Sequence, residues 1–348
     1  MKAITVAPGE PGSVRLDERP EPVADGLHLV VAAEALGICG TDREIISGAY
    51  GSAPPGADRL VLGHESLGRV VAAPESSGFA AGDRVVGVVR RPDPVPCPAC
   101  AAGEWDMCRN GLYTEHGIKA LDGFGAERFA LAPDRAVPVP ASLGLAAVLV
   151  EPASILAKAW DHVERIGRRT RSWRPTVVLV TGAGPVGLLG ALMAVQRGLE
   201  VHVLDRNQAG PKPRLVRALG GTYHVGPLPD DLAPDVILEC TGAPALVLEA
   251  MRRVAAGGIV CLTGVSGDGP PMPFDPGAFN RAMVLRNDTV FGSVNANRRH
   301  YLAAVRALAA ADPEWLDGLI TRRVPLSHWQ EAFERRDGDI KVVLTFDR

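Results

Sequence analysis

Thiol, imidazole and carboxylate side chains gather in two short strings near the start of the chain. The string GICGTDREI contains Cys39, with Thr41 two residues later, and the string GHESLGRVV places His64 and Glu65 side by side. Zinc is bound by sulfur, nitrogen and oxygen donors, and a catalytic zinc keeps one position open for water or substrate. A lone cysteine in an apolar run is usually a core residue, so the prediction of a catalytic metal site depends on the whole set.

Three of the six cysteines form a second cluster. Cys97, Cys100 and Cys108 follow the spacing C-x2-C-x7-C. In a cytosolic protein, where thiols stay reduced, such clustering favours a metal site over a disulfide. Cys240 and Cys261 lie instead in apolar runs with the character of strands, so we expect them to be inert core residues.

A glycine-rich turn, Gly182-x-Gly184-x-x-Gly187, lies between a predicted strand and a predicted helix. In a dinucleotide-binding turn the first glycine allows the tight bend and the second lets a pyrophosphate approach the backbone. The third lets the helix pack on the sheet, and the helix N-terminus supplies N–H donors. We therefore expect a nicotinamide dinucleotide here, contacted also by Pro185 and Val186. A plain strand–turn–helix connection is the alternative.

The next predicted strand ends at Asp205, roughly 20 residues beyond the first glycine, where a ribose-binding carboxylate is expected. A carboxylate accepts hydrogen bonds from both ribose hydroxyls of NAD and repels the 2′-phosphate of NADP. Arg206 follows directly and could pair with that phosphate, so NAD is favoured and NADP is the alternative. Thr241, directly after the predicted strand 235–240, is a further candidate cofactor contact.

The elements that must position these residues differ between two parts of the chain. Up to Glu151 the sequence is rich in Gly, Pro and short Val-rich runs, which are typical of an all-β, barrel-like unit. Residues 152–166 then have apolar residues at helical spacing. From residue 175 strands alternate with helices, which predicts an α/β fold with a doubly wound parallel sheet. The predicted strands are 176–181, 199–204, 235–240 and 258–263, and the predicted helices are 186–197, 213–219 and 298–311.

Composition limits the possible classes of protein. A chain of 348 residues is long for one core, so two domains are expected, and 47% hydrophobic with 22% charged residues is a globular composition. The formal net charge is −3 and no long basic stretch occurs, so no nucleic-acid partner is expected. The N-terminus lacks the layout of a signal peptide. Turn residues interrupt the uncharged stretch Val177–Val195, so we expect no membrane span and a cytoplasmic protein.

The motifs together resemble one family. The order CGTD, GHE-x-x-G-x-V, GDRV, EPASI and GAGPVG is similar to the zinc-containing medium-chain dehydrogenase/reductase family over essentially the whole chain. Within that family the strings GTDREI, VVRRP, YTEHGI, GSVN and DIKVV are most similar to archaeal-type glucose 1-dehydrogenases. The resemblance implies a GroES-like β-barrel catalytic domain over 1–155, a Rossmann cofactor domain over 156–291, and a return to the catalytic domain over 292–348.

The resemblance also implies roles for individual residues. Cys39 and His64 would bind the catalytic zinc, and Glu65 would bind it directly or through a neighbour. Glu151 of the EPASI string would be a further ligand or lie close by, where it could also meet the substrate. Thr41 would contact the substrate and pass its hydroxyl proton toward solvent, while zinc stabilises the alkoxide and hydride moves to the nicotinamide.

Two more residues are assigned to the substrate by the same resemblance. Glu115 would contact sugar hydroxyls, and Asn295 would lie near the nicotinamide and the substrate; an ordinary polar loop residue is the alternative for Glu115. The expected substrate is a sugar or polyol, above all an aldose such as glucose. A cyclitol or amino-polyol dehydrogenase, a zinc-free reductase and a non-catalytic NAD-binding regulator are the alternatives. A homodimer or homotetramer is implied.

The chain departs from the family in the second cysteine cluster. The family's structural zinc lobe has four cysteines, and this sequence has Pro94, which cannot bind metal, at the first of those positions. The carboxylate of the adjacent Asp93 could complete a tetrahedral set with the three thiolates, since zinc accepts oxygen donors. An empty or labile lobe is the alternative.

Overall fold

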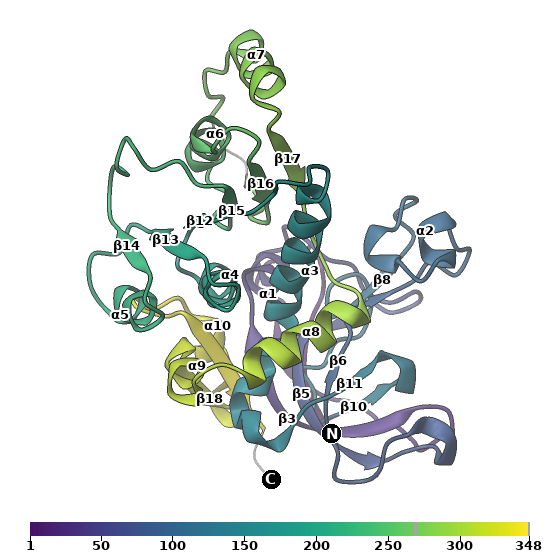
Figure 1. The fold of residues 1–348 in the computed structure, drawn as a ribbon. Helices are drawn as coiled ribbons and strands as arrows, with labels where there is room; N and C mark the ends of the chain where they lie inside the picture. The colour runs from purple at the N-terminus through teal and green to yellow at the C-terminus, as the bar shows by residue number, and fades with distance from the viewer. Residues whose placement is uncertain (268–269, 347–348) are drawn as a thin grey trace. The chain divides into compact units, whose positions relative to one another are not determined.

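The computed structural model describes residues 1–267 and 270–346 (Figure 1). The chain divides into two compact units. Unit 1 consists of Met1–Ser154 together with Asn295–Arg348, and unit 2 is the continuous segment Ile155–Val294. The chain therefore passes from one unit to the other twice.

Unit 1 is built on a seven-stranded sheet whose centre is β3, Leu29–Ile38. Antiparallel to it on one side runs β5, Glu65–Ala72, and on the other side runs β19, Lys341–Thr345. The register pairs Gly37 with Glu65 and Ile38 with Val342. The C-terminal end of β3 and the starts of β5 and β19 therefore lie side by side at one end of these strands. The other strands of this sheet are β6 Arg84–Gly87, β10 Arg128–Leu131, β11 Ala136–Pro138 and β18 Ile320–Pro325.

Smaller elements surround this sheet. One three-stranded sheet has the order β2-β1-β4 and another has the order β7-β8-β9. Their strands are β1 Lys2–Val6, β2 Arg15–Glu18, β4 Leu60–Val61, β7 Arg90–Arg91, β8 Thr114–His116 and β9 Ala120–Leu121. The helices of unit 1 are α1 Gly40–Ile46, α2 Pro98–Ala101, α8 Arg298–Ala309, α9 Pro313–Leu319 and α10 Trp329–Phe333. The core of this unit is a cluster made mostly of Val, Leu, Ile and Phe side chains from the strands, with Ile45, Trp329 and Ala332 from helices.

Unit 2 is a six-stranded parallel sheet with the order β14-β13-β12-β15-β16-β17. Its strands are β12 Val177–Thr181, β13 Glu200–Leu204, β14 Thr222–His224, β15 Val236–Glu239, β16 Ile259–Leu262 and β17 Thr289–Gly292. Besides most of α3, Val150–Gly167, its helices are α4 Pro185–Val195, α5 Pro211–Ala218, α6 Pro244–Arg253 and α7 Pro276–Arg286. The strand order reverses at β12, the place where open α/β sheets bind nucleotides. The parallel sheet confirms the predicted fold class.

The long apolar helix at the junction of the units is buried. The helical stretch Ala141–Gly167 begins in 3-10 turns, bends at Gly144 and continues as α3, Val150–Gly167. It is long and apolar enough to cross a membrane, but 72% of its most apolar part is buried inside the protein. Val177–Val195, the uncharged stretch of the sequence, is β12 followed by a turn and α4, as predicted.

The candidate metal centre and cofactor site

The predicted catalytic metal residues come together at the sheet edge where β3 ends. Cys39 follows β3, and His64 and Glu65 stand at the start of β5. The ligand atoms of these three residues all lie within 4.8 Å of one another. The Thr41 hydroxyl lies 3.9 Å from the Cys39 sulfur. One thiol, one imidazole and one carboxylate are donors that suit zinc, so the residues present fit the predicted ion.

Asp42 is a residue of this centre to which the sequence alone assigned no role. Its Oδ2 accepts a hydrogen bond from the Cys39 backbone at 2.8 Å, and its Oδ1 lies 3.4 Å from His64 Nδ1. Burial disfavours a charged imidazole, but Asp42 and Cys39 together outweigh this effect and raise the pKa of His64 well above its ordinary value. A carboxylate behind one ring nitrogen orients the other nitrogen toward a metal. The spacing Cys39-x-x-Asp42, a helix capping box, was the available sequence signal.

Glu65 has a buried partner that lies far away in the sequence. Lys341, the first residue of β19, donates hydrogen bonds to both Glu65 oxygens at 2.6 and 2.7 Å and to the Ile38 carbonyl at 3.2 Å. Both side chains are almost fully buried. A Cβ atom at Gly37 would lie 2.0 Å from a Glu65 oxygen, so glycine is needed opposite this pair. Glu65 is therefore held by a cation beside the other candidate ligands.

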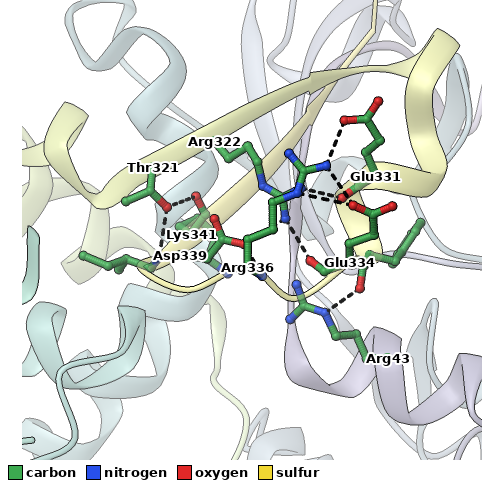
Figure 2. Close-up of polar contacts among 10 residues, drawn as sticks. Arg43, Thr321, Arg322, Glu331, Glu334, Arg336, Asp339 and Lys341 are labelled. Carbon is green, nitrogen blue, oxygen red and sulfur yellow. Dashed lines mark hydrogen bonds and ion pairs between the residues drawn. The ribbon is translucent and has the colours of Figure 1, made fainter. Parts of the chain in front are cut away.

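Lys341 is fixed in turn by the segment that precedes it (Figure 2). Thr321 Oγ1 donates to the Lys341 carbonyl at 3.3 Å and accepts from the Ile340 backbone at 2.9 Å. Arg322 donates to the Glu331 and Glu334 carbonyls and to the Asp339 carboxylate, at 2.6 to 2.8 Å. One arginine thus closes the loop between α10 and β19 and holds the start of β19 in place.

Glu151 lies near the metal centre but outside the group of three. It is buried in the first turn of α3. Burial raises the pKa of Glu151 to about 7; the charge of His64 acts against this rise and that of Glu65 acts with it. A carboxyl group in this state could change its charge with little cost when a cation arrives nearby.

The second cysteine cluster is also assembled. The sulfur atoms of Cys97, Cys100 and Cys108 lie within 4.8 Å of one another around the short helix α2. Backbone N–H groups, that of Arg109 above all, point at the Cys97 sulfur and lower the pKa of this thiol to about 6. Three thiols at this spacing fit a structural zinc ion.

Asp93, the predicted fourth ligand, has other partners. Its carboxylate accepts hydrogen bonds from the Val95 backbone at 2.8 Å and from the Asn110 side chain. The Asn110 amide oxygen in turn lies 3.0 Å from the Cys108 sulfur. The Asp93 carboxylate therefore orders the loop around the three sulfurs, and its binding of a metal stays a prediction.

The glycine-rich turn in unit 2 has the geometry expected of a pyrophosphate cradle. Gly182 has a φ of +91°, which only glycine adopts readily. A Cβ at Gly187 would lie 1.8 Å from the Gly182 carbonyl oxygen, so the third glycine lets α4 approach the turn. Gly184 precedes α4, whose first two residues are Pro185 and Val186. The turn borders a cavity of about 570 Å³, which Asp205, Arg206 and Thr241 also line.

Asp205 is engaged with protein atoms rather than left open. Its carboxylate accepts from the Ala183 backbone at 2.7 Å and the Asn207 backbone at 3.0 Å, and Lys212 Nζ lies 3.2 Å away. Burial raises the pKa of a carboxyl group, but these backbone bonds and the Lys212 charge outweigh it and lower the pKa of Asp205. Lys212, which also lines the cavity, was not found from the sequence.

Thr241 is held in position by hydrogen bonds to a buried carboxylate that the sequence analysis did not select. Glu239, fully buried at the end of β15, accepts from the Thr241 backbone at 2.8 Å, the Gly242 backbone at 3.1 Å and the Thr181 hydroxyl at 3.2 Å. The turns after β12 and β15, which border the cofactor cavity, are thereby held together.

Two of the four residues predicted to meet the substrate, Glu115 and Asn295, lie in unit 1 and contact each other. Asn295 Nδ2 donates to Glu115 Oε1 at 2.9 Å, and both side chains are buried. Asn295 adopts a left-handed backbone conformation, with a φ of +61°. The structure thus brings together residues that are far apart in the sequence.

A barrel-like β unit that carries the cysteine–histidine–glutamate cluster, combined with a nucleotide-binding parallel sheet, defines the class of zinc-containing medium-chain dehydrogenases/reductases. The comparisons with known proteins agree. The family model for the glucose dehydrogenase C-terminus matches residues 144–346, and that for the alcohol dehydrogenase GroES-like domain matches residues 25–141. The chain therefore belongs to the glucose dehydrogenase family.

Individual relatives match over their full length. The chain is 38% identical to a glucose 1-dehydrogenase of Methanocella arvoryzae and 41% identical to one of Thermoproteus tenax, in each case covering 99% of both chains. A solved structure of Haloferax mediterranei glucose dehydrogenase in complex with NADP, Zn and gluconolactone superposes with a TM-score of 0.92 at 33% identity, covering 100% of both chains. These matches confirm the family resemblance found in the sequence.

Proposed function

We propose that this chain is a zinc-dependent sugar dehydrogenase that oxidises the anomeric hydroxyl of an aldose such as glucose to a lactone. The hydride from C1 passes to NAD(P)+ and the hydroxyl proton goes to solvent, so one bond to hydrogen is lost at carbon and one at oxygen. The observation that carries the proposal is the cluster of Cys39, His64 and Glu65 in a chain of the glucose dehydrogenase family. The gluconolactone in the Haloferax structure supports the anomeric carbon as the reacting centre.

The residues of the centre divide the work between them. A bound zinc ion would stabilise the alkoxide that forms when the substrate loses its proton. Cys39, His64 and Glu65 would hold that ion, and Asp42 would keep the His64 ring in place. Glu151, which interacts electrostatically with His64 and Glu65, would be a further carboxylate for the ion. The Thr41 hydroxyl, close to the Cys39 sulfur, would accept the substrate proton and pass it on.

A spectrophotometric screen tests the proposal. Aldoses and cyclitols are offered with NAD+ and with NADP+, and formation of the reduced cofactor is followed before and after zinc is removed by chelation. Turnover of aldoses that chelation abolishes and zinc restores is expected. Full activity in protein shown to be free of metal would contradict it. Preference for a cyclitol, or cofactor binding without turnover of any alcohol, would favour the other candidate functions.

We also propose that the cofactor cavity accepts NADP+ in preference to NAD+. The sequence favoured NAD because of Asp205, but both Asp205 oxygens are already engaged by Ala183, Asn207 and Lys212. Lys212 and Arg206 line the same cavity and offer two positive charges to a 2′-phosphate. NADP in the Haloferax structure supports this assignment.

Lys212→Met is expected to raise KM for NADP+ by about tenfold, because one charge-assisted hydrogen bond contributes about 1.5–3 kcal/mol. KM for NAD+ should change by less than about twofold, since NAD lacks the phosphate. The matched control is Arg214→Met, which removes a charge from an exposed position of the same helix. Steady-state kinetics with both cofactors gives the result, and equal losses for NAD+ and NADP+ would exclude Lys212 as the selector.

For the oligomeric state we propose a homodimer or a homotetramer of dimers, formed through one edge of unit 2. β17 is the last strand in the sheet order, so within the described part of the chain one of its sides pairs with no strand. In the described structure α7 has no buried residue, and it exposes Val284 and Leu285. A helix with exposed apolar side chains that leads into the last strand of the sheet suits a second copy of the same surface.

Leu285→Asp is expected to shift the protein to a smaller species in light scattering coupled to size-exclusion chromatography. The reason is that a charge in an apolar contact between two copies opposes association. Val23→Asp, at an exposed apolar position in unit 1, is the control and should leave the mass unchanged. An unaltered mass for Leu285→Asp would place the contact elsewhere.

We further propose that the protein works in the cytoplasm. All six cysteines are free. Without a metal or a reducing environment, Cys39 and the three thiols Cys97, Cys100 and Cys108 would be open to oxidation. Activity recovered with the cytosolic fraction of lysed cells is the expected outcome.

A further inference from the structure

Arg90 and Glu115 form a buried ion pair between two short strands. They face each other in the antiparallel register of β7 and β8. The Arg90 Nε and Nη2 atoms each lie 3.0 Å from the same carboxylate oxygen, Glu115 Oε1. The exposed fractions of the two residues are 4% and 5%. The pair is therefore shielded from water, and this shielding strengthens the ion pair and fixes its geometry.

The third donor to the same oxygen is Asn295. Its Nδ2 lies 2.9 Å from Glu115 Oε1, and its Oδ1 accepts a hydrogen bond from the Ala296 backbone at 2.8 Å, which fixes the orientation of the amide. Glu115 Oε1 thus accepts all three of these bonds, and Oε2 accepts none of them. An ionised carboxylate has acceptor capacity on both oxygens, so Oε2 can still bind a donor from a ligand.

Arg90 is itself held from several sides. Its guanidinium lies 3.6 Å from the centre of the Tyr113 ring, and Lys119 Nζ lies 4.2 Å from the same ring centre. Arg90 Nη1 also contacts the Asp106 carbonyl at 3.5 Å. The aromatic ring stacks on the guanidinium, and the hydrogen bonds lie in its plane. Together they keep the N–H donors of Arg90 in a fixed orientation toward Glu115.

The two oxygens of the Glu115 carboxylate have different roles: Oε1 forms the ion pair, and Oε2 is left for a ligand. A buried carboxylate is tolerated only when it is paired and hydrogen-bonded, and Arg90 supplies that pairing through Oε1. With Oε1 paired in this way, Oε2 remains an acceptor for a hydroxyl. A site built around such an acceptor discriminates sharply against a substrate that lacks the hydroxyl, because the acceptor is then left unpaired.

We propose that Arg90 is a positioning residue that fixes Glu115 through Oε1, so that Oε2 accepts a hydrogen bond from one hydroxyl of the sugar. Arg90 thereby sets the discrimination between a sugar that carries this hydroxyl and its deoxy analogue. The inference rests on the proposed sugar dehydrogenase function, and it adds a specificity determinant outside the metal centre.

The test compares Arg90→Met, Arg90→Lys and Glu115→Gln with the wild-type enzyme on glucose and its monodeoxy analogues. In the wild type one deoxy sugar should have a much higher KM than glucose. Arg90→Met should raise KM for glucose by about tenfold while kcat changes by less than about threefold, because a positioned hydrogen bond to a charged group is lost and the reacting carbon is untouched. With that one deoxy sugar, both Arg90→Met and Glu115→Gln should have little further effect.

Controls separate positioning from a general loss of structure. Arg90→Lys keeps the charge and loses the fork, so it should restore part of the glucose KM and of the discrimination. Arg128→Met, at an exposed arginine paired with Glu21, should behave as the wild type. If Arg90→Met does not fold, as judged by thermal melting, Arg90→Lys and Glu115→Gln still give the comparison.

The outcomes distinguish the inference from the function on which it rests. A wild-type enzyme without aldose turnover would overturn the proposed function, and this is measured first. An active wild type together with folded Arg90 variants that keep the glucose KM and the full preference over every deoxy sugar would overturn the role of Arg90 and leave the proposed function standing.

Discussion

His64→Ala is expected to lower kcat for sugar oxidation by at least about 1,000-fold while the affinity for NADP+ stays within about twofold of wild type. The loss follows because a catalytic metal contributes several kcal/mol to the transition state and His64 is one of its three clustered donors. Cofactor binding should survive because the glycine-rich turn and Asp205 belong to unit 2 and His64 belongs to unit 1.

Three measurements check this result: the zinc content by elemental analysis, kcat by steady-state kinetics, and cofactor affinity by fluorescence titration. His28→Ala, which removes an imidazole from an exposed position beside Asp25, is the matched control and should leave all three unchanged. If cofactor affinity falls in parallel with activity, the metal centre of unit 1 and the cofactor site of unit 2 are not independent, which would contradict the prediction. Retained turnover in a zinc-free variant would contradict the metal mechanism.

Lys341→Met is expected to lower the free energy of unfolding by about 3–5 kcal/mol, measured on protein from which metal has been removed with a chelator. The reason is that the substitution leaves the buried Glu65 carboxylate without its cation. Lys2→Met, at an exposed position of β1, should change stability by less than about 0.5 kcal/mol. Chemical denaturation of both variants measures the difference.

Adding Glu65→Gln to Lys341→Met removes the uncompensated charge. The double variant should therefore regain much of the stability that Lys341→Met alone loses. A single variant as stable as the wild type would show that another cation replaces Lys341 beside Glu65. No such cation contacts Glu65 among the hydrogen bonds of the described residues.

Local sequence signals predicted the glycine-rich turn and its geometry, because the requirements of such a turn are local. A tight bend, a close helix and an adjacent acid each require particular residues within one short stretch, from Gly182 to Asp205. The candidate metal ligands Cys39 and His64 were identified through motifs of the family. Their meeting depends on the register between β3 and β5, which no single string reveals.

The residues that sequence analysis missed are partners across the fold. Lys341 meets Glu65 only because β19 pairs with β3, and a lone lysine in a strand has no local sign of its partner. Arg90 and Lys212 resemble ordinary solvated charges in the sequence, and their roles follow from the carboxylates they face. α7 was not predicted because its apolar residues follow no helical period.

Unit 2 is one uninterrupted segment, and its two ends are neighbours. Lys158, just after the chain enters the unit, donates from Nζ to the carbonyl of Val294, just before the chain leaves it, at 3.0 Å. A segment whose ends adjoin is a self-contained cassette: it can be cut out, closed with a short linker or exchanged for that of a relative without stretching the remaining chain. Gene fragments encoding residues 150–294, which keep α3 whole, should therefore yield a folded nucleotide-binding module.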